Sequence, residues 1–339
     1  MIIIVHSQSA IMKNLYLVFI ANCLLLAGTI NAQQDAAYNM YMFNGLYVNP
    51  AYAGSSNLLN MVAIYRRQWV GINGAPNTFN ISADSPLKRD QYALGLTISD
   101  DKIGLSNALS VTPAFAYRPR IGKVRLSIGL QASFTYFNVK NSEANLPDYS
   151  VTDPVYMTNV SMFVPNIGAG IYVSDLESKR FFAGISVPHF LPYSLRSNKV
   201  ETINSDAVSK LYNYYLATAG YVFGKEKSII KVEPSFLAMW QRGLPRNIPD
   251  FDINLMLIII DRIKVGVSYR TGGDISMTGQ GMVGMFEVKA TSQLRVGYAF
   301  DGNISGISAV NKGSHEIMVG YDFLVNKKRY ATPRYGRYF

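Results

Sequence analysis

The sequence predicts an all-β protein, a transmembrane antiparallel β-barrel of about 14 strands with long extracellular loops and short periplasmic turns. Residues 123–137 alternate between apolar and polar side chains over a length that suits a membrane. Strand-like segments elsewhere are joined by short and long connections in alternation. After an amino-terminal export signal, the longest unbroken apolar run is the six residues 255–260, which is too short for a transmembrane helix.

The alternation is clearest in residues 123–137, where the even positions from Val124 to Tyr136 are apolar. Side chains of a strand point alternately to opposite faces, so this segment has one apolar and one polar face. Residues 124–136 would rise about 40 Å along the strand, or about 30 Å along the axis of a barrel with tilted strands. We therefore expect the even positions to face lipid, with Tyr136 at the outer aromatic girdle, and Arg125, Gln131 and Thr135 to face the lumen.

The same alternation recurs along the chain, although it is mixed near residues 57–70 and 210–223. Short connections are expected at 86–90, 118–123, 176–179, 224–227, 261–262 and 291–292. Long connections are expected at 71–76, 100–107, 138–159, 189–209, 242–250, 272–278 and 301–313. An even strand number places both ends of the barrel on the short-turn side. The alternative is a pair of soluble β-sandwiches, whose strands are usually about half as long.

The amino terminus resembles a secretory signal peptide. Lys13 precedes the apolar run 15–27, and Thr29-Ile30-Asn31-Ala32 forms a small-residue cleavage site. We expect residues 1–32 to be the signal, with Met1 or Met12 as the start; a membrane anchor is the alternative, for which the run is short. The only cysteine, Cys23, lies within the signal, so the mature chain would hold no disulfide and no thiol-based metal or redox site.

The remaining chain divides into three parts. Residues 33–56 are an aromatic-rich segment, with a short helix expected near 35–43, that either packs into the barrel as a periplasmic plug or frays. Residues 57–325 form the barrel, and residues 326–339 form a basic, aromatic periplasmic tail. We expect the tail to dock a periplasmic partner, with a frayed end as the alternative. Its candidate partner-binding residues are Arg334, Tyr335, Arg337, Tyr338 and Phe339.

No motif points to catalysis, a cofactor or a metal site, so we predict a protein that is not an enzyme. The two mature histidines, His189 and His315, lack the spacing of metal ligands. Residues 279–284 match Gly-x-Gly-x-x-Gly, but they open a strand, whereas the dinucleotide fingerprint lies between a strand and a helix.

The mature chain keeps 31 basic and 22 acidic residues, a net charge of +9. The basic residues are dispersed over turns and alternate strand positions, which argues against nucleic-acid binding. Four of them fall on expected lumenal positions, namely Arg125, Lys264, Arg270 and Arg295. They either favour anions in the lumen or pair with acidic lumenal residues, namely Asp84, Asp252, Glu287 and Glu316.

Three stretches resemble the PorP/SprF family of Bacteroidetes. The first is Tyr41-Met42-Phe43-Asn44 followed by Asn49-Pro50-Ala51-Tyr52-Ala53-Gly54. The second is Arg67-Gln68-Trp69-Val70-Gly71 with Gly74-Ala75-Pro76-Asn77-Thr78 and Ser82-Ala83-Asp84-Ser85-Pro86, and the third is Ser314-His315-Glu316-Ile317-Met318. The family signature comprises Asn49, Pro50, Ala51, Tyr52, Gly54, Trp69, Gly74 and Pro76.

The resemblance implies an outer-membrane accessory component of type IX secretion that supports secretion or surface attachment of cargo, such as gliding adhesins, through the cargo's C-terminal sorting domain. Implied partners are that cargo, the periplasmic ring lipoproteins of the secretion and gliding machinery, and outer-membrane lipid. Both mature termini are expected in the periplasm. The alternative function is a passive outer-membrane porin or small-solute transporter.

Overall fold

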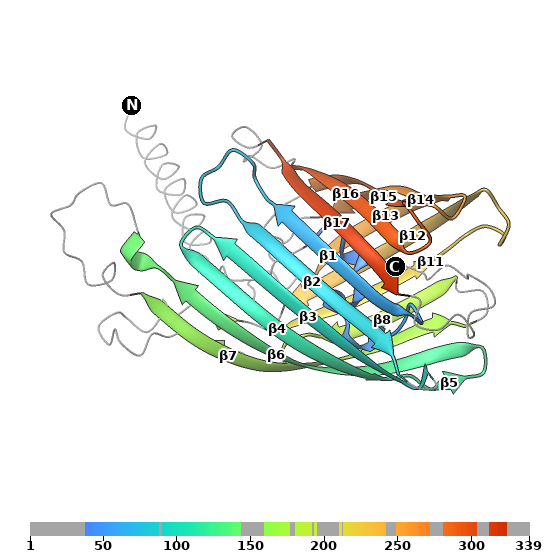
Figure 1. The fold of residues 1–339 in the computed structure, drawn as a ribbon, viewed down its shortest axis with the longest axis horizontal. Helices are drawn as coiled ribbons and strands as arrows, with labels where there is room; N and C mark the ends of the chain where they lie inside the picture. The colour runs from blue at the N-terminus through green and yellow to red at the C-terminus, as the bar shows by residue number, and fades with distance from the viewer. Residues whose placement is uncertain are drawn as a thin grey trace, which may run out of the picture. The chain divides into compact units, whose positions relative to one another are not determined.

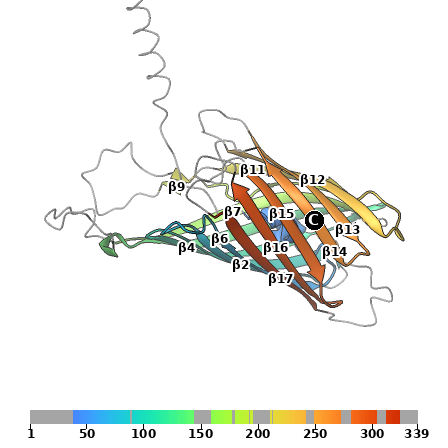
Figure 2. The same ribbon diagram turned by 90° about the horizontal axis from the view of Figure 1, so that it is seen from above.

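The computed structural model describes residues 38–87, 90–143, 159–176, 180–191, 193–194, 210–211, 213–241, 249–271, 281–303 and 312–323. These residues build one closed antiparallel sheet (Figures 1 and 2). The sheet has fifteen strands, but β5 is only a two-residue addition to β6. Fourteen strands therefore form the ring. Closure comes from the pairing of β1 with β17 and of β4 with β6. The predicted fold class is therefore confirmed.

The strands of the ring are β1 (Leu59–Arg67), β2 (Asn77–Pro86), β3 (Tyr92–Ile103), β4 (Ser106–Tyr117), β6 (Val124–Val139), β7 (Val160–Asp175), β8 (Phe181–Val187), β11 (Tyr214–Tyr221), β12 (Ile230–Gln241), β13 (Asp250–Ile259), β14 (Ile263–Arg270), β15 (Gly281–Lys289), β16 (Leu294–Asn303) and β17 (Ser314–Phe323). The short strand β5 (Arg120–Ile121) adds to β6, and β9 (Tyr193–Ser194) pairs only with β10 (Lys210–Leu211).

The helical elements are short: η1 (Tyr41–Phe43), α2 (Gly45–Val48), η2 (Pro50–Tyr52) and η4 (Asn141–Glu143). Within the described ranges, no helix is both long and apolar enough to cross a membrane. The helix expected near 35–43 is reduced to η1, because Asn44 breaks the turn before α2 begins. Residues 35–37 of that expectation lie outside the described part.

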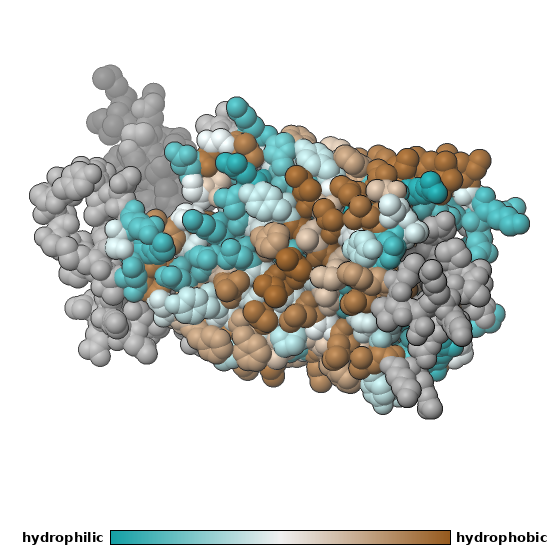
Figure 3. Space-filling model, in the orientation of Figure 1, coloured by the Kyte–Doolittle hydropathy of each residue, from teal (hydrophilic) through white to brown (hydrophobic). Residues whose placement is uncertain are grey.

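The alternating apolar and polar residues of the sequence lie on the outer and inner faces of the barrel, respectively. On β6, Leu130 is 59% exposed, whereas Arg125 is 4% and Ser127 is 2% exposed. The exposed apolar side chains cover the outer surface of the barrel, and polar residues gather toward the end where β6 and β7 are joined (Figure 3). The sequence-predicted faces of residues 123–137 are thus those of the structure.

The connections define two ends of the barrel, which we call the short-turn end and the long-loop end. Six connections meet at the short-turn end: 87–91, 118–123, 176–180, 222–229, 260–262 and 290–293. Seven meet at the long-loop end: 68–76, 104–105, 140–159, 188–213, 242–249, 271–280 and 304–313. The strand β1 begins, and β17 finishes, at the short-turn end, where Leu59 pairs with Phe323.

The prediction of a long connection at 100–107 is wrong. The strand β3 continues to Ile103 and β4 begins at Ser106, so a tight turn of two residues joins them. Asp101 and Lys102 are polar, yet they pair in the ladder with β4, and Thr78 Oγ1 donates to Asp101 Oδ1 at 2.7 Å. Polar residues mark the end of the apolar band here, and the hairpin continues beyond it.

Candidate functional site: the lumenal plug

The lumen of the barrel is occupied by residues 38–57, which we call the plug. Its aromatic and aliphatic side chains, from Tyr38 through Tyr52, belong to the buried core of the protein. Its asparagines, Asn39, Asn44 and Asn49, are buried as well. Buried amides must be hydrogen-bonded to be stable, and the polar inward faces of the strands supply the partners. The polar side chains of the plug and those of the lumen wall are therefore hydrogen-bonding partners of each other.

The plug runs along the barrel from the long-loop end to the short-turn end. The backbone N–H groups of Asn39 and Met40 donate to Glu316, which lies near the long-loop end of β17. Farther along, Asn44 exchanges hydrogen bonds with the middle of β2. At the other end, Gly54 N donates to Asp84 at 2.7 Å, near the short-turn end of β2. The expectation of a periplasmic mature amino terminus concerns residues outside the described part; residues 38–40 lie toward the long-loop end.

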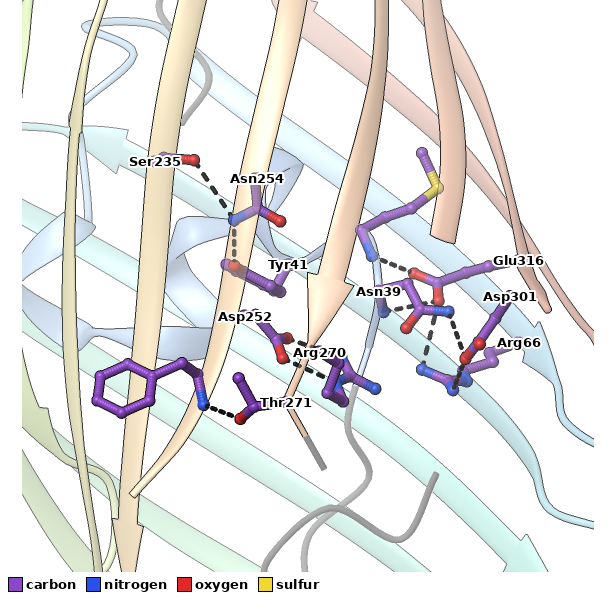
Figure 4. A network of polar contacts seen from close by, with 12 residues as sticks. Asn39, Tyr41, Arg66, Ser235, Asp252, Asn254, Arg270, Thr271, Asp301 and Glu316 are labelled. Carbon is purple, nitrogen blue, oxygen red and sulfur yellow. Dashed lines mark hydrogen bonds and ion pairs between the residues drawn. The ribbon is translucent and has the colours of Figure 1, made fainter. Parts of the chain in front are cut away.

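A buried charge network holds the first residues of the plug (Figure 4). Glu316 accepts from the backbone N–H groups of Asn39 and Met40 at 2.9 and 2.8 Å. Arg66 lies 3.7 Å from Glu316 and 3.3 Å from Asp301, and Asn39 Nδ2 donates to Asp301 at 3.3 Å. The carboxylates thus serve both the arginine and the plug. Sequence analysis did not single out Arg66 or Asp301, although both lie at inward-facing positions of their strands.

A second contact ties η1 to β13. Asn254 of β13 donates through Nδ2 to Tyr41 Oη at 2.6 Å. Beside it, Lys264 Nζ lies 5.8 Å from the ring centre of Phe43.

The lumenal basic residues are paired with acids or carbonyls. Arg270 makes a bidentate pair with Asp252, both bonds being 2.8 Å, and Arg295 lies 3.5 Å from Glu287. These two pairs follow the pairing alternative. Two details differ: Lys264 pairs with Glu233, and Glu316 pairs with Arg66. Of the other two residues considered, Arg125 donates to the Asp90 carbonyl, and Asp84 accepts from Asn60 as well as from Gly54.

Hydrogen bonds of Asn49 hold the centre of the plug in place. Its Oδ1 accepts from Ala51 N at 2.9 Å and so caps η2, whose first residue is Pro50. Its Nδ2 donates to the carbonyls of Ile171 and Ile185, at 3.0 and 3.2 Å, on the adjacent strands β7 and β8. One asparagine side chain therefore shapes the turn and fastens it to the wall.

Inward-facing glycines leave the space that the plug fills. At Gly129 a Cβ atom would overlap the backbone of Pro50 and Ala51, and at Gly170 it would overlap Asn49 Oδ1. Three more glycines have the same role: Gly95 against Leu46, Gly184 against Asn49 and Gly297 against Met40. Their placement on inward positions of different strands was a signal available in the sequence, but its meaning depends on the plug.

The remaining signature residues do not join the plug. Trp69, Gly74 and Pro76 lie in the connection between β1 and β2. Trp69 N donates to Ser314 Oγ at 3.3 Å, and the Gly74 carbonyl accepts from Gly104 N at 2.9 Å. Trp69 and Gly74 have φ angles of 46° and 74°, the left-handed region that Gly adopts without strain. These residues fasten the first hairpin to its neighbours at the long-loop end.

Other candidate residues are dispersed. The proposed docking residues of the tail lie outside the described part of the chain. His315 Nδ1 is 2.6 Å from Tyr298 Oη, and His189 Nδ1 is 3.5 Å from Ser133 Oγ. Within the described residues, no three His, Cys, Asp or Glu side chains gather in a group that could hold a metal ion.

Replacing Asn49 with alanine is expected to lower the free energy of unfolding by about 2–3 kcal/mol, because it removes a helix cap and two bonds to strand carbonyls. Urea titration of the protein in detergent micelles would measure the loss. The matched variant Asn49→Asp keeps the cap acceptor but loses the two donated bonds, so it should also be destabilised. An Asn49→Ala protein as stable as the wild type would contradict this role.

A closed sheet that is apolar outside, charged inside and filled by its own preceding segment defines an outer-membrane β-barrel with an internal plug. A family model described as type IX secretion system membrane protein PorP/SprF matches residues 30–321. The chain belongs to this family. The match includes the plug and almost all of the barrel.

Two solved outer-membrane barrels are similar to this chain at low sequence identity. The toluene transporter TbuX of Ralstonia pickettii is 11% identical, with a TM-score of 0.50, covering 82% of this chain and 92% of that one. Omp33 of Acinetobacter baumannii is 10% identical, with a TM-score of 0.45, covering 79% of this chain and 100% of that one. A comparison with curated protein sequences found no match. At these identities the likeness concerns the fold alone.

Proposed function

We propose that this protein is a non-enzymatic accessory component of type IX secretion in the outer membrane. It supports secretion or surface attachment of cargo proteins, such as gliding adhesins, through their C-terminal sorting domain. Family membership supports the assignment to this secretion system. The observation that carries the accessory role is the plug, because a lumen filled by buried, hydrogen-bonded residues suits a platform for partner proteins better than a passive pore.

The alternative is a porin or small-solute transporter, and the names of similar barrels such as TbuX give it some support. A porin needs a water-filled path through the lumen. Here the plug is bonded to β17, β2, β13 and the β7–β8 pair, on different sides of the ring. A plug that is fastened at these places is held within the lumen, which favours the accessory role.

Each partner would meet a different end of the barrel. Cargo would meet the long-loop end, which we place outside the cell, because loops carry specificity while the barrel positions them. Periplasmic ring lipoproteins would meet the short-turn end and the basic tail 326–339, with Arg334, Tyr335, Arg337, Tyr338 and Phe339 as anchors. Residues 1–32 would serve as the cleaved export signal.

Deleting the gene is the direct test. We expect the deletion strain to lose at least one protein with a type IX C-terminal domain from its surface, and the wild-type gene to restore it. Surface proteolysis followed by mass spectrometry would identify the missing proteins. A matched complementation with a chain that stops at residue 325 would test the tail separately. A deletion strain that keeps its full set of surface proteins would contradict the proposed function.

A further inference from the structure

The outward-facing residues of β1, β2 and β3 become basic and polar at the long-loop end. Nearer the middle of the barrel, Tyr65 of β1 and Phe79 of β2 pair across the ladder, and both rings face outward, 45% and 43% exposed. Side chains two residues apart on a strand share a face. The next outward residues toward the loops are therefore Arg67, Asn77 and Lys102, which we call the basic row.

The ladder places the basic row side by side on three neighbouring strands. Arg67 pairs with Asn77, and Asn77 pairs with Lys102. Neighbouring strands are about 4.8 Å apart, so the Cα atoms of Arg67 and Lys102 are separated by roughly 10 Å. Both side chains are exposed and long enough to meet at one anionic group beside Asn77. The structure describes the two connections next to Asn77 and Lys102, 68–76 and 104–105.

The basic row carries a net positive charge. Asp100 is the one acidic residue at the outward positions of β1, β2 and β3, all of which are described, and it pairs with Phe79, one step nearer the middle of the barrel. Together with Arg67 and Lys102 it leaves a net charge of +1 on this face. The face therefore suits an anion.

The level of the basic row is set by the aromatic residues below it. The ladder row of Phe79 runs through Asp100 and Leu109 to Tyr136, the residue expected in the outer aromatic girdle. The basic row is the next step beyond, where the lipid-facing surface reaches the headgroups. On the face that β1, β2 and β3 share, Figure 3 shows polar residues toward the long-loop end and apolar residues nearer the middle.

Asparagines continue the basic row on the next two strands. Lys102 pairs with Asn107 of β4, and Asn107 pairs with Asn138 of β6. Amide side chains donate and accept hydrogen bonds, as sugar hydroxyls do. Cations next to a run of amides match a phosphorylated sugar better than they match a bare phosphate or a simple phospholipid.

This polar character is confined to one sector of the ring. At the long-loop end of β13, β14 and β15, the outward residues are Phe251, Tyr269 and Met282, all apolar or aromatic and exposed. A general change from lipid to water would affect all strands alike. The basic row is therefore a local feature of β1, β2 and β3 and not a uniform rim.

We propose that the basic row binds a phosphate group of a glycolipid in the outer leaflet of the membrane. The rings of Tyr65 and Phe79 would lie against the first part of the acyl chains. Arg67 and Lys102 belong to strands whose outward face meets lipid, so a membrane lipid reaches them directly. A guanidinium and an ammonium group both bind phosphate by charge-assisted hydrogen bonds. The inference rests on the proposed function only in placing the long-loop end outside the cell.

The test compares two double variants that remove the same two charge types from opposite ends of the barrel. Arg67→Ala/Lys102→Ala removes the basic row, and Arg120→Ala/Lys227→Ala removes exposed cations at the short-turn end. The probe is bisphosphorylated lipid A, added to the purified full-length protein in micelles, and native mass spectrometry measures its dissociation constant. We expect the first variant to bind about tenfold more weakly than the wild type and the second to bind equally well.

A charge-preserving exchange tests the same site without removing a cation. Arg67→Lys/Lys102→Arg should bind lipid A nearly as well as the wild type, because both positive charges remain. A loss as large as that of the alanine variant would contradict a site that depends on charge. Lipid A from which both phosphates have been removed should bind the wild type about as weakly as intact lipid A binds the alanine variant.

Several results would overturn the proposal. They are equal affinities of the two double variants for lipid A, equal binding of lipid A with and without phosphates, and equal or tighter binding of phosphatidylglycerol, as a reversed orientation would give. Displacement of lipid A by inorganic phosphate would show a simple anion site and would also overturn the glycolipid assignment. None of these results affects the loss of surface proteins from a deletion strain, which tests the proposed function separately.

Discussion

Replacing Glu316 with alanine is expected to destabilise the barrel by about 3–5 kcal/mol, the usual cost of breaking a buried ion pair from one side. Glu316 is fully buried, faces Arg66 and accepts two plug N–H groups. Its removal takes away one of the two acidic partners of Arg66 within the described residues, the other being Asp301, and leaves the N–H groups of Asn39 and Met40 without this acceptor. Urea titration in micelles, followed by tryptophan fluorescence, would measure the change.

The chain offers a matched control for this substitution. Glu143 also forms an ion pair, 2.8 Å from Lys140, but both side chains are more than half exposed. Exposed pairs contribute at most about 1 kcal/mol, so Glu143→Ala should change stability little. A further variant, Glu316→Gln, keeps an acceptor for the plug while losing the charge opposite Arg66, and it should fall between the wild type and Glu316→Ala. Equal stability of Glu316→Ala and Glu143→Ala would contradict the role of the charge network.

Replacing Gly129 with valine is expected to displace the plug, because the added side chain would occupy the position of the Pro50 and Ala51 backbone. Overpacking of this kind typically costs about 1–3 kcal/mol, and the hydrogen bond from Ser127 Oγ to the Ala51 carbonyl would be strained as well. Planar-bilayer recordings should show a silent wild-type barrel and a conducting Gly129→Val barrel. A large, stable conductance of the wild-type protein would instead favour the porin alternative.

Displacement of the plug can also be measured chemically. Ala53 is fully buried, and residues 33–339 contain no cysteine, so an Ala53→Cys reporter can be labelled selectively with a maleimide in a chain expressed without Cys23. The reporter should be protected in the wild-type background and labelled in the Gly129→Val background. Gly284→Val is the matched control, because a Cβ atom at Gly284 meets nothing within 4 Å. Equal labelling in the Gly129→Val and Gly284→Val proteins would argue against the role of Gly129 in leaving space for the plug.

Local chemistry was enough to predict the barrel. The period of two in residues 123–137, and its recurrence along the chain, follow from the demand that one face of each strand meets lipid and the other meets the lumen. The alternation of connections then indicated the strand number. The wrong assignment of 100–107 as a long loop has the same origin: polar residues such as Asp101 mark the end of the apolar band, which is not where the strand ends.

By itself, the sequence determined the class of sheet, the inward and outward faces, and the family to which the chain belongs. It left open whether residues 33–56 pack or fray, because that outcome depends on partners far along the chain: Asn39 binds Glu316 across 277 positions. Only the closed barrel brings Arg66, Asp301 and Glu316 together around the plug. Only there do glycines on separate strands lie side by side and leave the space that the plug occupies. Such contacts form only once the ring of strands has closed, so no local pattern can encode them.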